Sequence, residues 1–280
     1  LEHDFIGELE IPNDCYYGIQ THRALNNFHI TGLSVNSEPF MVKALGYVKK
    51  AAAMANRDCG VLKPEIAEAI ITASDEVISG KYNDQFSTDL IQGGAGTSVN
   101  MNANEVIANI ALEKMGHKKG EYQYCHPNNH VNCSQSTNDA YPSAFRIALI
   151  LRLQRYQIEL EKLSESFAIK GKEFKDVLKM GRTQLQDAVP MSLGSEFRGW
   201  SITIHEELER VESSKRLISQ INMGATAIGT RVNAPDGYPE MVTQYLADLT
   251  GLKLSLAHDL IEATSDTGAY VQLSGVLKRT

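Results

Sequence analysis

The chain has 280 residues, of which 42% are hydrophobic and 22% are charged, and its formal net charge is −7. This composition is typical of a globular protein with enough apolar residues for a sizeable core. The acidic balance argues against a nucleic-acid-binding protein, which needs Lys and Arg clustered on one face, and no apolar run approaches the roughly 20 residues that span a bilayer.

The N-terminal sequence, LEHDFIGELE, is acidic and alternating, so it does not look like a secretory signal. The cysteines are spread through the chain, which argues against a disulfide framework. They are Cys15, Cys59, Cys125 and Cys133. We therefore expect a cytoplasmic protein with reduced thiols.

The residues up to position 115 predict a short β-hairpin followed by helices. Residues 4–18 alternate and then break at IPND, which is typical of a short hairpin or an extended arm. Residues 39–58 and 64–79 have the pattern of amphipathic surface helices, the second with proline at its first position. Residues 81–92 lack a clear period and predict a loop, and a further helix is expected from about 98 to 115.

The second half of the chain predicts two long helices with a heptad pattern. The first is marked by apolar residues that step by four and three: Leu149, Leu153, Tyr156, Leu160, Leu163 and Phe167. Residues 193–218 continue this alternation with one stutter. Each helix of about thirty residues would be roughly 45 Å long, which is too long for a compact monomer of this size. We therefore expect a bundle shared between subunits rather than an antiparallel bundle within one chain.

One segment, CHPNNHVNC, gathers side chains of the kinds that bind zinc: Cys125, His126, His130 and Cys133. The spacing is unfavourable, because the adjacent Cys125 and His126 cannot easily reach one tetrahedral ion together with the others. Pro127 and two asparagines mark a turn in which these side chains diverge. We therefore predict a loop here and no metal site.

Three polar strings are the most informative feature of the sequence: GGAGTSVN at 93–100, SQSTND at 134–139 and GRTQLQDAVP at 181–190. Each is expected to open a long helix. Backbone N–H groups at the start of a helix, together with the positive end of its dipole, favour a bound anion. Three such openings predict a pocket for a polycarboxylate.

The first string is not a nucleotide-binding loop, because no Lys-Ser or Lys-Thr pair follows its glycines and the G-x-G-x-x-G spacing is missing. It leaves Thr97 and Ser98 as hydrogen-bond donors and helix caps. Capping alone would explain one such string.

The other two strings carry more polar side chains than their local structure requires. Ser136, Thr137 and Asn138 follow one another, whereas a helix cap needs only one of them. Thr183 and Gln184 likewise exceed what a turn requires. This surplus favours a ligand.

These motifs resemble the aspartase branch of the aspartase and fumarase superfamily. The resemblance extends from residue 4 to residue 278, and its longest motifs are GGAGTSVNMNANEV, GEYQYCHPNNHVNCSQSTNDAYP, KMGRTQLQDAVPMSLGSEFR, MGATAIGT and DLIEATSDTGAY. STND and GRTQLQDA look more like aspartases than like class II fumarases, which have the style SSND and GRTHLMDA. Because only these few positions distinguish the two groups, a class II fumarate hydratase is the alternative enzyme.

The resemblance implies a carbon–nitrogen lyase that reversibly eliminates ammonia from L-aspartate to give fumarate, through an aci-carboxylate intermediate and without a cofactor. It implies substrate-binding roles for Thr97, Ser136, Thr137, Asn138, Thr183 and Gln184. The first three would hold the β-carboxylate, and the others would position the amino group and the α-carboxylate. It also implies a homotetramer whose sites are shared between subunits.

The resemblance and the helix pattern together predict an all-α fold. We expect a mostly helical N-terminal domain with a short β-hairpin at residues 1–135, and an incomplete central helical bundle at residues 136–280.

Family members are considerably longer. The loop GSSxMPxKxNP, which carries their general-base serine and a substrate-pairing lysine, is expected after Lys278, and a C-terminal domain is expected beyond it. We therefore assign no catalytic residue and predict that the 280-residue chain is inactive by itself. A non-catalytic dicarboxylate-binding remnant is the other alternative. Arg231 stands where a glycine is usual, and its cation could pair with substrate or crowd the site.

Overall fold

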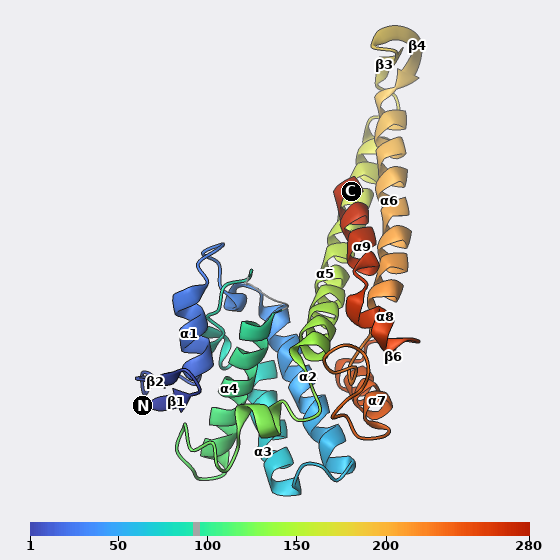
Figure 1. Ribbon diagram of the computed structural model, residues 1–280. Helices are drawn as coiled ribbons and strands as arrows, with labels where there is room; N and C mark the ends of the chain where they lie inside the picture. Colours follow the sequence, from blue (N-terminus) through green and yellow to red (C-terminus); the bar gives the residue numbers. More distant parts are fainter. Residues whose placement is uncertain (92–95) are drawn as a thin grey trace. The chain divides into compact units, whose positions relative to one another are not determined.

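Helices dominate the computed structural model, which describes residues 1–91 and 96–280 (Figure 1). The chain forms two compact units: the first comprises Leu1–Leu149 with Ser219–Asp266, and the second Ile150–Ile218 with Thr267–Thr280. The domain boundary predicted after residue 135 stays a prediction. Among the described residues, no helix has the length and apolar character needed to cross a membrane.

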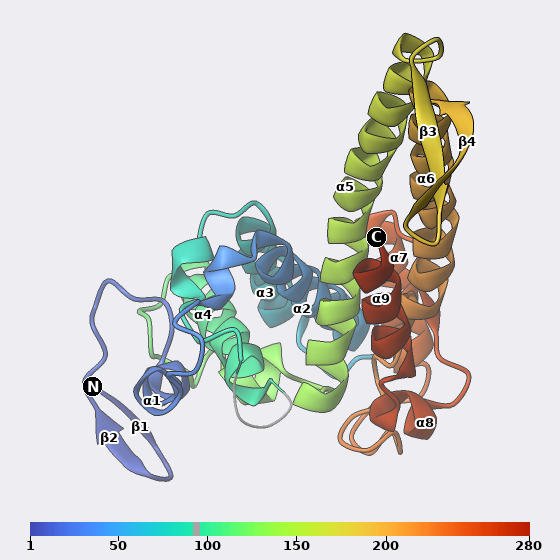
Figure 2. The same ribbon diagram turned by 90° about the horizontal axis from the view of Figure 1, so that it is seen from above.

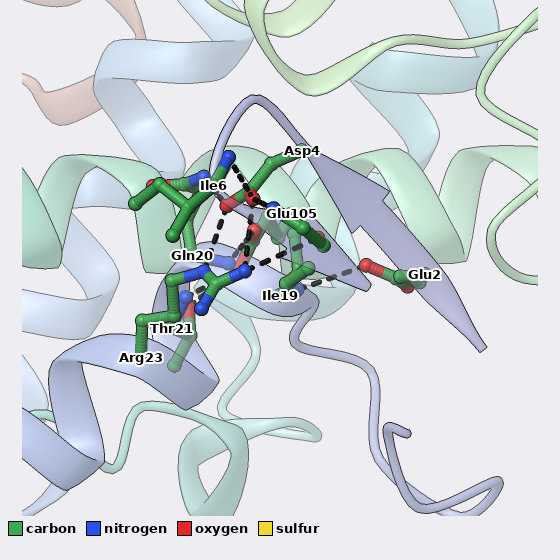
Figure 3. A network of polar contacts seen from close by, with 9 residues as sticks. Glu2, Asp4, Ile6, Ile19, Gln20, Thr21, Arg23 and Glu105 are labelled. Atoms are coloured by element: carbon green, nitrogen blue, oxygen red, sulfur yellow. Dashed lines mark hydrogen bonds and ion pairs between the residues drawn. The ribbon is translucent and has the colours of Figure 1, made fainter. Parts of the chain in front are cut away.

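The predicted N-terminal hairpin is present and begins at Glu2. Strand β1 (Glu2–Asp4) pairs antiparallel with β2 (Gly7–Leu9). The Asp4 carboxylate accepts bonds from the Arg23 guanidinium, at 2.9 Å from both Nε and Nη2 (Figure 3). Because Arg23 lies on α1 (Ile19–Asn27), this bidentate ion pair fastens the hairpin to that helix.

A buried carboxylate caps the start of α1, which lacks a side-chain cap of its own. Glu105, from α4 (Thr97–Lys114), accepts hydrogen bonds from the backbone N–H groups of Gly18, Gln20 and Thr21 (Figure 3). The Thr21 hydroxyl also donates to it, at 2.6 Å. Burial raises the pKa of Glu105, and these hydrogen bonds act in the opposite direction. The N-terminal segment is thereby tied to α4.

Helices α2 (Pro39–Asp58), α3 (Pro64–Ile78) and α4 lie side by side in the core of the first unit (Figure 1). Their bounds lie within one residue of the predicted helices. The prediction of a surface helix is wrong for α2, which is largely buried because α3, α4 and α7 (Tyr238–Thr250) all pack against it. Its alanine-rich middle lets these neighbours approach closely, so even Lys49 is fully buried.

The rest of the first unit consists of short elements. The predicted loop at 81–92 contains a 3-10 turn, η2 (Asn83–Gln85). The CHPNNHVNC segment forms a π-helical turn, η3 (Pro127–Val131), in place of a plain loop. The C-terminal part contributes β5 (Gln220–Ile221), its parallel partner β6 (Ser255–Leu256) and α8 (Leu260–Ser265).

The second unit contains two long antiparallel helices. The distal part of α5 (Thr137–Glu173) runs beside α6 (Leu193–Ile218), and α9 (Gly268–Arg279) packs against α6 (Figure 2). Small residues bring the two long helices together, since Ser164 and Ser201 each donate a hydroxyl hydrogen bond to the other's carbonyl oxygen, at 2.9 and 2.8 Å. The predicted helices are confirmed.

The third polar string does not open a helix, so that prediction is wrong. Its residues form an antiparallel hairpin of β3 (Leu178–Thr183) and β4 (Gln186–Ser192), and α6 begins only at Leu193. The two turn residues, Gln184 and Leu185, have φ values of 50° and 63°. Such a left-handed two-residue turn matches the twist of a hairpin, but it usually contains glycine or asparagine, so the sequence lacked the usual signal.

Candidate active site

The first two polar strings come together where α4 and α5 begin. Gly96 caps α4 in the left-handed region, with φ at 86°, and a Cβ there would lie 2.5 Å from Cγ of Tyr141 on α5. The Asn100 amide of α4 donates to the Thr137 hydroxyl at 3.3 Å. Glycine is required at position 96 because only it permits both this backbone conformation and this close approach. Residues 92–95, which include part of the first string, lie outside the described residues.

The start of α5 is closed by a capping arrangement. The Ser136 backbone N–H donates to Asp139 Oδ1 at 2.9 Å, and the Asn138 backbone N–H donates to Ser136 Oγ at 3.3 Å. This arrangement resembles a capping box in which aspartate replaces the usual glutamate and the serine hydroxyl accepts from the second helical residue, where a capping box uses the third. Ser136 and Asp139 therefore account for the cap, which leaves the side chains of Thr137 and Asn138 as the surplus.

A segment from the C-terminal part of the first unit, residues 222–227, packs on this helix start. The Asn138 amide Nδ2 donates to the Ala227 carbonyl oxygen at 2.7 Å, and the Asn222 amide donates to the Asn138 carbonyl oxygen at 3.0 Å. Because Nδ2 of Asn138 is bound to a carbonyl oxygen, its Oδ1 is the atom available as an acceptor. This segment includes most of the MGATAIGT motif, and its position at the site was not predicted from the sequence.

A buried cation lies behind the two helix starts. Lys49 Nζ donates to Asn100 Oδ1 at 2.7 Å, Asn132 Oδ1 at 3.0 Å and Gln135 Oε1 at 2.9 Å. Burial lowers the pKa of Lys49 to about 7, and the nearby carboxylate of Asp139 acts in the opposite direction. One ammonium group thus joins two segments: the first turn of α4, through Asn100, and the loop before α5, through Asn132 and Gln135.

Asn56 lies two turns after Lys49 on α2 and holds the same loop. Its amide Nδ2 donates to the Cys133 carbonyl oxygen at 2.9 Å, and its Oδ1 accepts from the Ser134 hydroxyl at 2.6 Å. Ser134 has a φ of 59°, so this loop adopts a strained left-handed conformation just before the helix. Neither Lys49 nor Asn56 was predicted from the sequence. The signal that could have found them is a lysine and an asparagine seven residues apart, and therefore on one face, in an alanine-rich helix.

Asp139 is a fully buried acidic residue at the site. Its burial raises the pKa to about 6, while backbone hydrogen bonds from Ser136, Thr226 and Gly224 and the charge of Lys49 act in the opposite direction. Asp139 is the last residue of the SQSTND string, and the sequence pattern alone predicted no role for it.

The first unit brings together part of the predicted set at the adjoining starts of α4 and α5: Thr97, Ser136, Thr137 and Asn138. Thr183 and Gln184 belong to the second unit, on the exposed β3–β4 hairpin.

Arg231 adopts a left-handed conformation with a φ of 61°, which explains why glycine suits this position. Its guanidinium lies 3.3 Å from the Glu240 carboxylate, so it pairs with a protein side chain.

The described residues contain no group of three or more His, Cys, Asp and Glu side chains placed to hold a metal ion. In CHPNNHVNC, the His126 ring instead caps η3, because its Nδ1 accepts from the Asn128 and Asn129 backbone N–H groups. The chemistry available at the helix starts is therefore that of hydroxyl, amide and backbone donors beside a buried cation. Such a set suits a carboxylate ligand.

This fold is that of a known class of helical lyases. The lyase family profile matches residues 7–280, so the chain belongs to that family. It is 55% identical to the aspartate ammonia-lyase of Pseudomonas aeruginosa over 281 residues, and 53% identical to that of Helicobacter pylori J99 over 279. The aspartate ammonia-lyase of Escherichia coli K12 is 53% identical over 280 residues. The resemblance to aspartases predicted from the motifs is confirmed.

Each of these alignments covers 100% of the chain but only 59% or 60% of the relative. The chain therefore spans about three fifths of the length of the curated relatives it matches.

Solved structures agree with the predicted fold. A fumarate lyase:delta crystallin from Brucella melitensis bound to cobalt superposes with a TM-score of 0.97 at 49% identity, covering 99% of the chain and 60% of that protein. A class II fumarase from Schistosoma mansoni superposes with a TM-score of 0.92 at 32% identity, covering 99% and 61%. The prediction of an all-α fold with a short hairpin is confirmed.

Proposed function

We propose that the whole protein is an aspartate ammonia-lyase, a carbon–nitrogen lyase that reversibly converts L-aspartate into fumarate and ammonia. The observation that carries this proposal is the identity of 53–55% to aspartate ammonia-lyases over the whole chain. It is supported by the adjoining starts of α4 and α5, which present hydroxyl and amide groups to one side of a buried ammonium.

Elimination begins when a base removes a proton from the carbon beside the β-carboxylate, which places a second negative charge on that group. Thr97, Ser136 and Thr137 would stabilise this aci-carboxylate, helped by the positive ends of two helices. A preorganised donor aimed at developing charge is worth about 3 to 4 kcal/mol in transition-state stabilisation.

The substrate amino group needs acceptors at the neighbouring carbon. Asn138 Oδ1 suits this role, because its Nδ2 is already bound to the Ala227 carbonyl oxygen. We assign Thr183 and Gln184 to the amino group and α-carboxylate, as the resemblance implies. The general base is expected on the family's GSSxMPxKxNP loop, so no residue of this chain is assigned as base.

The test is the ultraviolet absorbance of fumarate formed from L-aspartate. We expect no turnover above background from the 280-residue chain, and turnover from a version extended to the full length of its relatives. A full-length version that hydrates fumarate faster than it aminates it would be a class II fumarase instead. A version that binds dicarboxylates but does neither would be a non-catalytic remnant.

We also propose a cytoplasmic homotetramer with sites shared between subunits. Its support is the apolar surface that α5 and α6 leave exposed in the second unit, where Ile169 is 56%, Ile202 55% and Trp200 44% exposed. Light scattering coupled to size exclusion should give the mass of four chains at full length. A monodisperse monomer with full activity would contradict this proposal.

A further inference from the structure

We propose that Asp139 is a positioning residue that joins residues 222–227 to the start of α5 and thereby holds Thr137 and Asn138 in place for the substrate. This inference rests on the proposed function. It means that residues 222–227, which lie outside the three polar strings, help to hold the site residues in position.

The two oxygens of the Asp139 carboxylate serve different segments. Oδ1 accepts from the Ser136 backbone N–H at 2.9 Å, within α5's own cap. Oδ2 accepts from the backbone N–H groups of Gly224 at 3.1 Å and Thr226 at 2.9 Å, which lie more than eighty positions later in the chain. Capping α5 requires only the hydrogen bond to Oδ1, so the hydrogen bonds to Oδ2 are not explained by capping.

The segment that Oδ2 holds is itself constrained. Thr226 has a φ of 61°, a conformation that a β-branched residue adopts only when its surroundings enforce it. On either side of it, Asn222 donates to the Asn138 carbonyl oxygen and Ala227 accepts from the Asn138 amide. The orientation of the Asn138 side chain therefore depends on a segment whose backbone is fixed by Asp139.

The titratable side chains near the Asp139 carboxylate come from two helices other than α5. Lys49 on α2 is the charged neighbour, and Tyr238 on α7 is a fully buried phenol whose pKa is raised by burial and by the charge of Asp139. Asp139 must be ionised to accept all three backbone N–H bonds without directing its own proton at a donor. Burial raises its pKa to about 6, whereas the three backbone hydrogen bonds act in the opposite direction because they favour the ionised form. Acidification through that value should therefore weaken these three hydrogen bonds, even though it removes the cost of burying the charge.

The decisive variant is Asp139→Asn in the full-length protein. We expect kcat for L-aspartate to fall at least about tenfold, equivalent to 1.36 kcal/mol, with a higher KM. The matched control is Asp259→Asn, because Asp259 also caps a helix of the first unit, accepting from the backbone N–H groups of Ile261 and Glu262, but is exposed. The control should keep both constants.

The dependence of kcat/KM on pH distinguishes positioning from capping. In the unmodified protein, activity should decline on the acid side with an apparent pKa near 6, and Asp139→Asn should remove that dependence from what activity remains. Unchanged kcat, KM and pH profile in Asp139→Asn would overturn the inference. So would an equal loss of activity in Asp259→Asn.

Amide hydrogen exchange tests the connection without using activity, and also if Asp139→Asn fails to fold. In the unmodified protein, the protection of Gly224 and Thr226, corrected for intrinsic exchange, should fall as the pH is lowered through about 6, while that of Ile261 should not. Constant protection at Gly224 and Thr226 would overturn the inference. Absence of turnover of L-aspartate in the unmodified protein would instead reject the proposed function, and the exchange result would still judge the connection.

Discussion

Fully buried polar residues organise the candidate site more than its hydroxyl side chains do. Lys49 and Asp139 are fully buried, and each is bonded to segments that are distant in sequence. A buried charge is tolerated only when hydrogen bonds replace its lost hydration, so such residues confine their partners to one arrangement. The side chains that we propose to face the substrate are held in place by that arrangement.

Replacing Lys49 by methionine should lower the free energy of unfolding by about 3 kcal/mol, because three amide oxygens would lose their shared donor inside the core. Lys50→Met is the matched control, since the neighbouring Lys50 forms an ion pair with the partly exposed Asp75 and such pairs contribute about 0 to 1 kcal/mol. Urea unfolding measures both. Equal losses in the two variants would contradict the assigned role.

Gly96→Ala should cost more stability than a left-handed conformation alone explains. Gly116 offers the control, because its φ of 82° is close to the 86° of Gly96, yet a Cβ there would meet nothing within 4 Å. We expect Gly116→Ala to cost about 1 to 2 kcal/mol from backbone strain, and Gly96→Ala to cost more through its clash with Tyr141. The difference between the two unfolding free energies isolates the contact between the helix starts.

At the scale of elements, the β3–β4 hairpin departs from the local preferences of its own residues. Its turn holds Gln184 and Leu185 in the left-handed region, and Leu185 is 100% exposed, so no packing within this chain repays the strain. Strained backbone conformations cluster at functional sites, which is consistent with the role proposed for Gln184.

Leu185→Gly should therefore stabilise the hairpin by about 1 to 2 kcal/mol, because glycine adopts this conformation without the steric cost. Val189→Gly is the comparison: Val189 is an exposed β4 residue outside the left-handed set, so glycine there should weaken the hairpin by about 0.5 to 1 kcal/mol. Exchange protection of the amides paired across Thr183 and Gln186 reports both changes. A loss of protection in Leu185→Gly would refute the strain argument.

At the scale of the whole molecule, ionisable groups act on stability in two opposing ways. Ion pairs lower the pKa of Asp4 from 3.8 to about 2 and that of Glu76 from 4.5 to about 2. These carboxylates stabilise the fold above their ordinary pKa values, and that contribution is lost as the pH falls toward about 2. The raised pKa of Asp139 has the reverse effect, since burial disfavours its ionised form and stability is therefore lost as the pH rises from 3.8 to about 6.

We expect the urea midpoint of the chain to fall between pH 4.5 and about 2 as Asp4 and Glu76 become protonated. Glu76→Gln should reduce this dependence, because Glu76 pairs with both Lys81 and Lys114, whereas Asp75→Asn at a half-exposed surface pair should leave it nearly unchanged. A pH dependence identical in Glu76→Gln and the unmodified chain would contradict the assignment.

Much of this architecture could be predicted from the sequence, because it follows from local patterns. Apolar periodicity and proline positions located α2, α3 and α4 to within one residue, and the heptads of residues 149–218 marked the two long helices. The polar strings showed the family resemblance. They also predicted the polar residues at the starts of α4 and α5, which lie next to each other in the first unit.

The remaining features depend on contacts between residues far apart in the chain, which no local pattern encodes. The burial of α2 follows from three helices that pack around it, and Lys49 and Asp139 acquire their partners only through that packing. The turn at Gln184 likewise contains no glycine that would predict a hairpin. Strand pairing imposes its left-handed conformation against the local preference of its two residues. The local sequence therefore determined the helices and the hydrogen-bond donors. The positions of those donors relative to one another depend on tertiary packing, so only the three-dimensional structure showed them.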